Sequence, residues 1–93
     1  MNQTLLFRVH AVQRMFERYI SVKNVCQVLQ SGETIEDYST EMREPSHLIL
    51  GFHGKRALHV VTSEDPEKSQ ITVITVYVPD PQKWNKNFKS RRS

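Results

Sequence analysis

Three side chains suited to phosphodiester chemistry lie four residues apart near the N-terminus: His10, Arg14 and Arg18. Residues four apart lie above one another on a helix, so a helix here presents one imidazole and two guanidiniums on one face. A guanidinium donates in a planar fork that matches phosphate oxygens, and an imidazole titrates near neutral pH. The alternative is a solvent-facing polar side on which Glu17 forms an ion pair.

Another candidate histidine, His59, lies between Leu58 and Val60 in an apolar segment with the pattern of a strand. A lone histidine on a strand is either a structural residue with satisfied hydrogen bonds or a proton-transfer group. Strand alternation places His59 and Tyr77 together on the sheet face opposite the core. An open sheet face of this kind is a usable ligand surface. His59 and Tyr77 are therefore further candidate catalytic residues.

The C-terminal segment is strongly basic. Residues 81–93 carry five cationic residues and no acid, whereas residues 1–80 carry 8 basic and 10 acidic residues. Such a tail, from about residue 82, attracts RNA through phosphate contacts and counterion release, or it is simply solvated. A short terminal helix is expected to carry Trp84 and Phe88, and Trp84 either stacks on bases or pins the tail onto the core. The candidate RNA-binding residues are Lys83, Lys86, Lys89, Arg91 and Arg92.

Several kinds of chemistry are excluded or disfavoured. The single cysteine, Cys26, leaves no partner for an intramolecular disulfide or a shared-thiolate zinc site, and we interpret it as a small core residue. The four histidines match no common metal-ligand spacing, so we expect no metal and no cofactor. No phosphate-binding loop, dinucleotide-binding glycine pattern or nucleophile elbow is present. With no run of signal-peptide or membrane-spanning length, we expect a cytoplasmic protein without membrane contact.

Two helices are expected to position the N-terminal residues, near 10–19 and 22–31. Ser21 is a good N-cap for the second helix, and Gly32 is expected to end it in the left-handed conformation. The apolar stripes are Val12, Met15, Phe16 and Tyr19 in the first helix and Val22, Val25, Cys26 and Leu29 in the second.

Strands are expected to follow the helices. The pattern predicts an edge strand over Thr34–Tyr38, a loop over Ser39–Ser46, and three strands over His47–His53, Arg56–Ser63 and Gln70–Val78. Gly54 supplies the positive φ of a tight turn. The fold class is α+β, a single domain over 1–93 with two N-terminal helices on one face of a three- to four-stranded antiparallel sheet. The residues expected to be buried together are Leu48, Leu50, Phe52, Val25, Leu29, Met15 and Phe16.

A series of motifs, in order along the chain, resembles a known family. They are His10-Ala11-x2-Arg14-Met15-x-Glu17-Arg18, Ile20-Ser21, Gly32 with Ile35-x2-Tyr38, Leu58-His59-Val60-Val61, and Ile74-Thr75-Val76-Tyr77 with Pro79-Asp80-Pro81-x2-Trp84. The pattern resembles an uncharacterised bacterial domain family, a domain of unknown function, related to the BrnT toxins in the RelE/ParE-like toxin superfamily. The resemblance runs from about His10 to Trp84.

The resemblance implies a RelE/BrnT-like fold whose free sheet face meets RNA. It also implies the toxin component of a type II toxin–antitoxin system, an endoribonuclease that often acts on the ribosome. A cognate antitoxin, often a small zinc-finger protein, holds such toxins inactive. This chain departs from many ribosome-acting relatives because its positive charge resides in the tail rather than in the body.

Metal-independent RNA cleavage needs a base for the 2′-hydroxyl, cations for the phosphorane and an acid for the leaving 5′-oxygen. His59 or His10 would transfer protons. Arg14 and Arg18 would bind the phosphate, and Tyr77 would act as a supporting donor. Two alternatives to catalysis stay open: a nucleic-acid-binding regulatory module and a protein-interaction domain.

Overall fold

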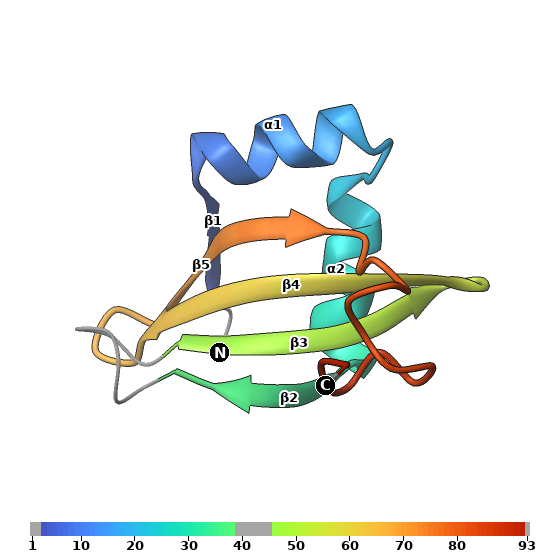
Figure 1. Ribbon diagram of the computed structural model, residues 1–93. Coiled ribbons are helices and arrows are strands. Elements are labelled where there is room, and N and C mark those ends of the chain that lie inside the picture. Colours follow the sequence, from blue (N-terminus) through green and yellow to red (C-terminus); the bar gives the residue numbers. More distant parts are fainter. Residues whose placement is uncertain (1–2, 39–45, 93) are drawn as a thin grey trace.

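The computed structural model describes residues 3–38 and 46–92 of the 93-residue chain. The elements, in chain order, are β1 (Thr4–Phe7), α1 (Val9–Glu17), α2 (Val22–Ser31), β2 (Glu33–Asp37), β3 (Ser46–His53), β4 (Arg56–Asp65) and β5 (Gln70–Tyr77). Figure 1 shows α2 behind the sheet and the C-terminal residues crossing in front of it. Both predicted helices and the strands from β2 to β5 are confirmed. Residues 39–45 of the predicted loop lie outside the described residues, and Ser46 begins β3.

The sheet has five strands in the order β1-β5-β4-β3-β2. Strands β2 to β5 form an antiparallel meander, whereas β1 pairs with β5 in parallel, with Thr4 opposite Gln70 and Phe7 opposite Val73. The prediction of a three- to four-stranded, purely antiparallel sheet is therefore correct in class but wrong in strand number and in strand direction, because it lacks the parallel strand β1. The predicted edge strand, β2, does lie at an edge of the sheet. A four-residue strand has too little alternation to be recognised in a sequence. Its pairing gives no local signal either, because its partner strand lies far along the chain.

Helix α1 packs on β5 through a narrower face than its sequence indicates. Ala11 and Met15 are buried against Val73 and Val76, and the predicted burial of Phe16 is wrong, because its side chain is 85% exposed. The Arg8 N–H donates to the Val73 carbonyl at 3.1 Å, directly before the helix begins. This continuation of the β1–β5 pairing fixes how α1 leaves the sheet. It therefore decides which side of the helix meets the core.

The end of α1 turns a large aromatic side chain outward. Tyr19 has a φ of 57°, and the Ile20 N–H donates to the Met15 carbonyl at 2.8 Å. This is the Schellman arrangement, in which a left-handed residue closes the helix and the next residue packs back on it. Ile20 is buried with Met15, whereas Tyr19 is almost fully exposed.

Helix α2 lies close to the sheet because two glycines leave room for it. Its N-cap is confirmed: Ser21 and Asn24 bond each other's backbone in a capping box. A Cβ added to Gly51 would lie 2.8 Å from the Val28 methyl carbons. One added to Gly32 would lie 2.4 Å from the Val28 carbonyl oxygen. The expected left-handed conformation of Gly32 is wrong, since its φ is −76°, whereas Gly54, at +63°, is confirmed as the turn residue.

The two faces of the sheet carry different residues. Ile49 and Val60 are partners across β3 and β4 and belong to the core beneath the helices. Leu50 pairs with His59, which pairs with Tyr77, and these residues occupy the opposite face. The expectation that Leu48, Leu50 and Phe52 pack under the helices is therefore wrong, because α2 approaches on the Gly51 side of β3. The placement of His59 and Tyr77 on the second face is confirmed.

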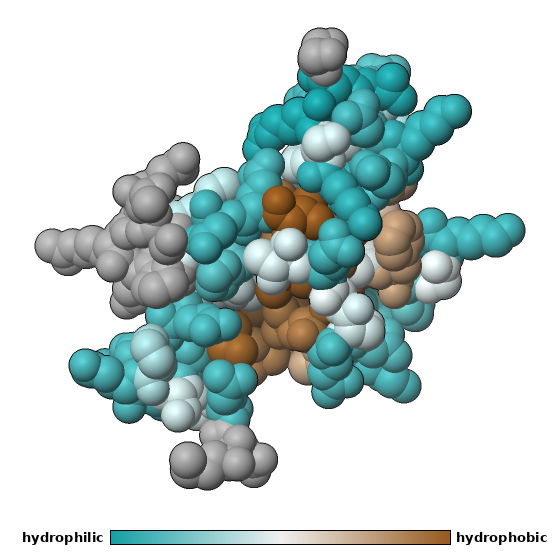
Figure 2. Space-filling model, turned by 90° about the horizontal axis from the view of Figure 1, so that it is seen from below, coloured by the Kyte–Doolittle hydropathy of each residue, from teal (hydrophilic) through white to brown (hydrophobic). Residues whose placement is uncertain are grey.

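The apolar core also reaches the surface. Seen from below, hydrophobic residues occupy the middle of the molecule and hydrophilic side chains surround them (Figure 2). The partly buried apolar residues that pack against the core are Leu5, Phe7, Leu29 and Ile49. The helical layer therefore does not cover its face of the sheet completely.

The second face is covered by the C-terminal strap, which we define as residues 79–92. The expected helix carrying Trp84 and Phe88 is wrong: the strap makes a turn in which the Trp84 N–H donates to the Asp80 carbonyl at 3.0 Å. It then folds back through a bridge between Trp84 and Arg91. The anchor interpretation of Trp84 is confirmed, since only 4% of its side chain is exposed.

Replacing Gly32 tests the close approach of α2 to β3. Gly32→Ala and Gly32→Asn should each lower the free energy of unfolding by about 1–3 kcal/mol, because any Cβ meets backbone oxygen atoms. Urea unfolding measures the change. At a position with left-handed backbone, by contrast, replacing glycine by asparagine lowers the free energy of unfolding less than replacing it by alanine.

Gly54 provides the matched control, because it has a positive φ and open space around it. Gly54→Asn should lower the free energy of unfolding less than Gly54→Ala. Finding the same preference for asparagine at Gly32 would contradict the packing explanation.

Candidate functional site

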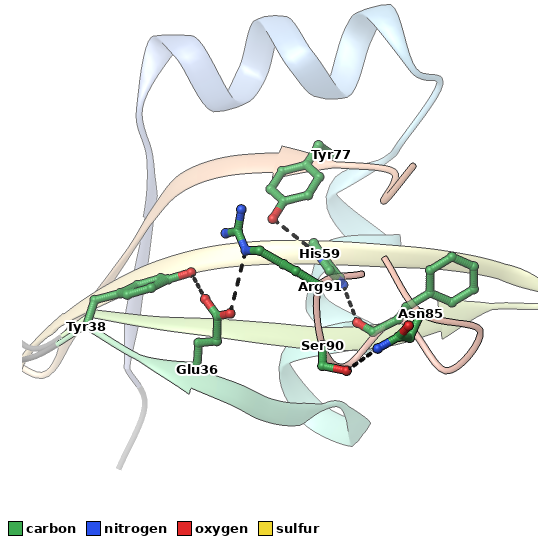
Figure 3. Close-up of polar contacts among 8 residues, drawn as sticks. Glu36, Tyr38, His59, Tyr77, Asn85, Ser90 and Arg91 are labelled. Carbon is green, nitrogen blue, oxygen red and sulfur yellow. Dashed lines mark hydrogen bonds and ion pairs between the residues drawn. The ribbon is translucent and has the colours of Figure 1, made fainter. Parts of the chain in front are cut away.

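The second face of the sheet carries a histidine–tyrosine pair. His59 Nδ1 lies 3.1 Å from the Tyr77 hydroxyl oxygen, and His59 Nε2 lies 2.9 Å from the Phe88 carbonyl oxygen (Figure 3). A carbonyl only accepts, so Nε2 carries the proton and donates to Phe88, while Nδ1 accepts from the Tyr77 hydroxyl. His59 is completely buried. Its imidazole is thus neutral and held in one tautomer.

Aromatic rings enclose this imidazole. The Trp84 ring meets it edge-on at 4.4 Å between centroids, and the Tyr77 ring does so at 5.1 Å. Burial lowers the pKa of His59 below its ordinary value of 6.5, against a smaller opposing effect of its hydrogen bond to Phe88. Burial raises the pKa of Tyr77. Both groups are therefore uncharged at neutral pH.

A second polar pair lies on the same face, toward the edge strand. Tyr38 donates its hydroxyl hydrogen to Glu36, and the pKa of Tyr38 rises to about 12 through burial, this hydrogen bond and the charge of Glu36. Glu36 is the register partner of Leu48 on β3, so it faces the His59 side of the sheet. Residues two apart on a strand share a face, which brings Glu36 and Tyr38 together.

Arg91 links the strap to both pairs. Its Nε lies 4.0 Å from a Glu36 carboxylate oxygen, and its guanidinium carbon lies 4.9 Å from the centre of the Trp84 ring. Figure 3 shows Arg91 between the Glu36–Tyr38 pair and His59. The polar cluster therefore combines a carboxylate, an imidazole, a guanidinium and two phenols. Its residues are Glu36, Tyr38, His59, Tyr77 and Arg91.

The candidates on α1 do not join this cluster. His10, Arg14 and Arg18 are all exposed, on a helix that packs against the opposite face of the sheet. Arg14 Nη1 lies 3.3 Å from Glu17 Oε1, as the ion-pair alternative predicted. The structure therefore brings together His59 and Tyr77 but leaves the three helical residues apart from them. The physical reason is that Ala11 and Met15, rather than the charged side of α1, meet the sheet.

The basic residues of the C-terminus lie in the strap. Lys89 Nζ is 3.2 Å from Glu33 Oε2, and Arg92 Nε donates to the carbonyls of Pro81 and Trp84. Lys83 and Lys86 are exposed. The strap is therefore folded onto the sheet, and RNA binding by its cations stays a prediction.

Sequence reasoning did not place three residues in the polar cluster: Glu36 and Tyr38 were not candidates, and Arg91 was predicted only as an RNA-binding residue of the tail. Glu36 and Tyr38 could have been found, since two polar residues at strand spacing on an edge strand share a face. Arg91 had no local signal, because its position depends on how the strap folds back. Within the described residues, no group of three histidine, cysteine, aspartate or glutamate side chains could hold a metal ion. Neither α1 nor α2 has the length and apolar composition needed to cross a membrane.

Fold and site together define a small α+β domain whose C-terminal strap encloses a histidine–tyrosine pair on a mixed sheet. The chain belongs to the family described as a domain of unknown function, DUF4258, whose model matches residues 7–78. The match contains Glu36, His59 and Tyr77 and ends before the strap. It confirms the uncharacterised-family part of the resemblance. No curated protein and no solved structure matches the chain.

The buried imidazole predicts how stability depends on pH. Below pH 6.5 the unfolded chain binds a proton at His59 that the folded chain excludes, so stability present above pH 6.5 falls as the pH decreases. Of the nearby charges, Glu36 raises and Arg91 lowers the His59 pKa. Urea unfolding between pH 7.5 and 5 should show this loss, with a slope approaching about 1.4 kcal/mol per pH unit for one proton.

Two variants isolate the contribution of His59 to that slope. His59→Gln should flatten the pH dependence, whereas the exposed His10→Gln should leave it as in the wild type. Equal slopes for His59→Gln and wild type would contradict the assignment.

Proposed function

We propose that the chain is the toxin component of a type II toxin–antitoxin system, a RelE/BrnT-like endoribonuclease that cleaves RNA without a metal ion. The observation that carries the proposal is the polar cluster on the second face of the sheet. Cleavage of an RNA phosphodiester needs a base, an acid and a cation, and the carboxylate, the imidazole and the guanidinium of the cluster can supply them.

Each step of the reaction has a group in the cluster. Glu36 takes the proton of the 2′-hydroxyl, and the 2′-oxygen forms a bond to phosphorus while the bond from phosphorus to the 5′-oxygen breaks. Protonated His59 gives its proton to that leaving oxygen. Arg91 stabilises the charge on the phosphorane. The products are a 2′,3′-cyclic phosphate and a 5′-hydroxyl, after which Glu36 and His59 exchange protons with water.

Tyr77 and Tyr38 act as positioning residues. The Tyr77 hydroxyl donates to His59 Nδ1 and orients the ring, and the Tyr38 hydroxyl donates to Glu36. His59 must first lose its cover to become an acid, because the buried ring is neutral. His10, Arg14 and Arg18 take no part in this reaction, because they are carried by α1 on the other side of the sheet.

A second candidate function, a protein-interaction module, is favoured by a different observation. The outer side of α1 exposes a continuous row of apolar side chains at helical spacing, and large exposed patches of this kind mark interaction surfaces. A shallow depression lined by Val12, Gln13, Phe16 and Glu17 lies on this side. The row consists of Val9, Val12, Phe16 and Tyr19. Within the toxin proposal this surface is the docking site of the cognate antitoxin, and Arg14 and Arg18 at its margin suit an acidic segment.

RNA cleavage by purified protein tests the proposed reaction. Glu36→Gln and His59→Ala should each reduce the cleavage rate about 100-fold or more, because each removes a group that acts in the transition state. The assay follows cyclic-phosphate products from single-stranded RNA, with and without ribosomes. Glu36→Gln keeps the size of the side chain and an oxygen that can accept from the Tyr38 hydroxyl, so this variant removes the charge of the carboxylate with little change in shape.

Arg14→Ala separates this site from the one on α1. Loss of cleavage in Arg14→Ala together with full activity in Glu36→Gln would place the chemistry on α1 instead. If wild-type protein cleaves no RNA under either condition and does not slow bacterial growth, the interaction-module function takes the place of the enzyme.

A further inference from the structure

We infer that the C-terminal strap is a latch over a binding site for single-stranded RNA, and that RNA opens it by taking Arg91 and Lys89 from their carboxylate partners. The inference deepens the proposed function and rests on it for the fate of the bound RNA. Glu36 and Glu33 are the partners of these cations.

The strap covers the residues that would act on RNA. His59 has no exposed surface, and two of the groups that enclose it, the Trp84 ring and the Phe88 carbonyl, belong to the strap. A phosphate cannot reach His59 while these groups are in place. The family match ends at residue 78, so the strap lies outside the matched segment.

The strap holds its own shape. The Asn85 N–H donates to the Ser90 carbonyl at 2.9 Å, and the two side chains bond at 2.7 Å. The Arg92 N–H donates to the Lys83 carbonyl at 2.9 Å. These contacts run within the strap and do not involve the sheet. The strap can therefore move away from the sheet as one folded piece.

The ion pairs between the strap and the sheet are weak. The side chains of Lys89 and Glu33 are 47% and 58% exposed, and Arg91 is 66% exposed beside Glu36. Ion pairs this accessible contribute little to stability, because water and salt screen them. The firmer attachments are the packing of Trp84 on the His59 ring and the hydrogen bond from His59 to Phe88.

RNA supplies stronger partners than the two carboxylates. A phosphate accepts a forked pair of hydrogen bonds from arginine, and binding of several cations releases counterions from the RNA. Lys83 and Lys86 are exposed and available for first contact. Once the strap lifts, the Trp84 face is free to stack on an unpaired base, which favours single-stranded RNA over a duplex. His59 then loses its cover and can accept a proton.

Trp84 is the only tryptophan of the chain, so its fluorescence reports the position of the strap. Full-length protein is titrated with 2′-O-methyl oligouridine, which cannot be cleaved because its 2′-oxygen carries no proton. We expect a change in the intensity and wavelength of the Trp84 emission, weaker at high salt. A duplex of the same RNA chemistry should produce a smaller change. RNA binding without any change in emission would overturn the latch.

Glu33→Gln loosens the latch without altering the polar cluster or the cations of the strap. It should bind the oligonucleotide about three-fold more tightly than Glu67→Gln, the matched control, which makes the same charge change in the β4–β5 turn. Equal affinities of the two variants would contradict the role of the Lys89–Glu33 tie.

Cleavage of unmodified RNA distinguishes the latch from the proposed function. If oligouridine opens the strap but neither wild type nor Glu33→Gln cleaves RNA, the endoribonuclease proposal fails and the latch stands. If wild type cleaves RNA while the Trp84 emission stays constant, the latch fails and the endoribonuclease stands.

Discussion

A fully buried imidazole has two ring nitrogens that both need hydrogen-bond partners, and in this protein the two partners come from different layers. The Tyr77 hydroxyl, on the neighbouring strand, donates to Nδ1, and the Phe88 carbonyl, in the strap, accepts from Nε2. Leaving either nitrogen unpaired in the interior would cost about 1–3 kcal/mol. The hydrogen bond to Phe88 therefore fixes where the strap crosses the sheet. Trp84 then closes the remaining side of the ring.

The other face of the sheet obeys a steric constraint. Helix α2 lies so close to β3 that any side chain at Gly51 would meet the Val28 methyl groups. Gly51 faces α2, and strand alternation places its neighbour Leu50, together with the Leu50 partner His59, on the opposite side. The close approach of α2 on one face is therefore compatible with a glycine at this position and not with a larger residue. The two faces are coupled by backbone geometry alone.

The elements with local signals could be predicted from the sequence. The Ser21 cap, the Gly54 turn and the alternating strands depend on residues within a few positions of one another. The location of His59 and Tyr77 on one face followed from alternation. Strand β1 could not be predicted in this way, because Thr4–Phe7 forms a strand only by pairing with β5, more than sixty residues away along the chain.

The predictions for the buried side of α1 and for the path of the strap were wrong for the same reason. Phe16 extends the apolar stripe of α1, yet the start of the helix beside β5 turns Ala11 and Met15 inward instead. A hydrophobic pattern gives the width of an apolar stripe but not which part of it meets the core. Arg91 joined the site only through long-range contacts of the strap, for which a basic run of residues carries no signal.

Nuclear magnetic resonance of the full-length chain can show whether the strap encloses His59 in solution. We expect nuclear Overhauser contacts between the His59 ring protons and the Trp84 ring, because the centroids of the two rings are 4.4 Å apart. We also expect slow solvent exchange of the His59 Nε2 proton, which is donated to the Phe88 carbonyl. A His59 ring without contacts to Trp84, and with a rapidly exchanging Nε2 proton, would contradict this enclosure.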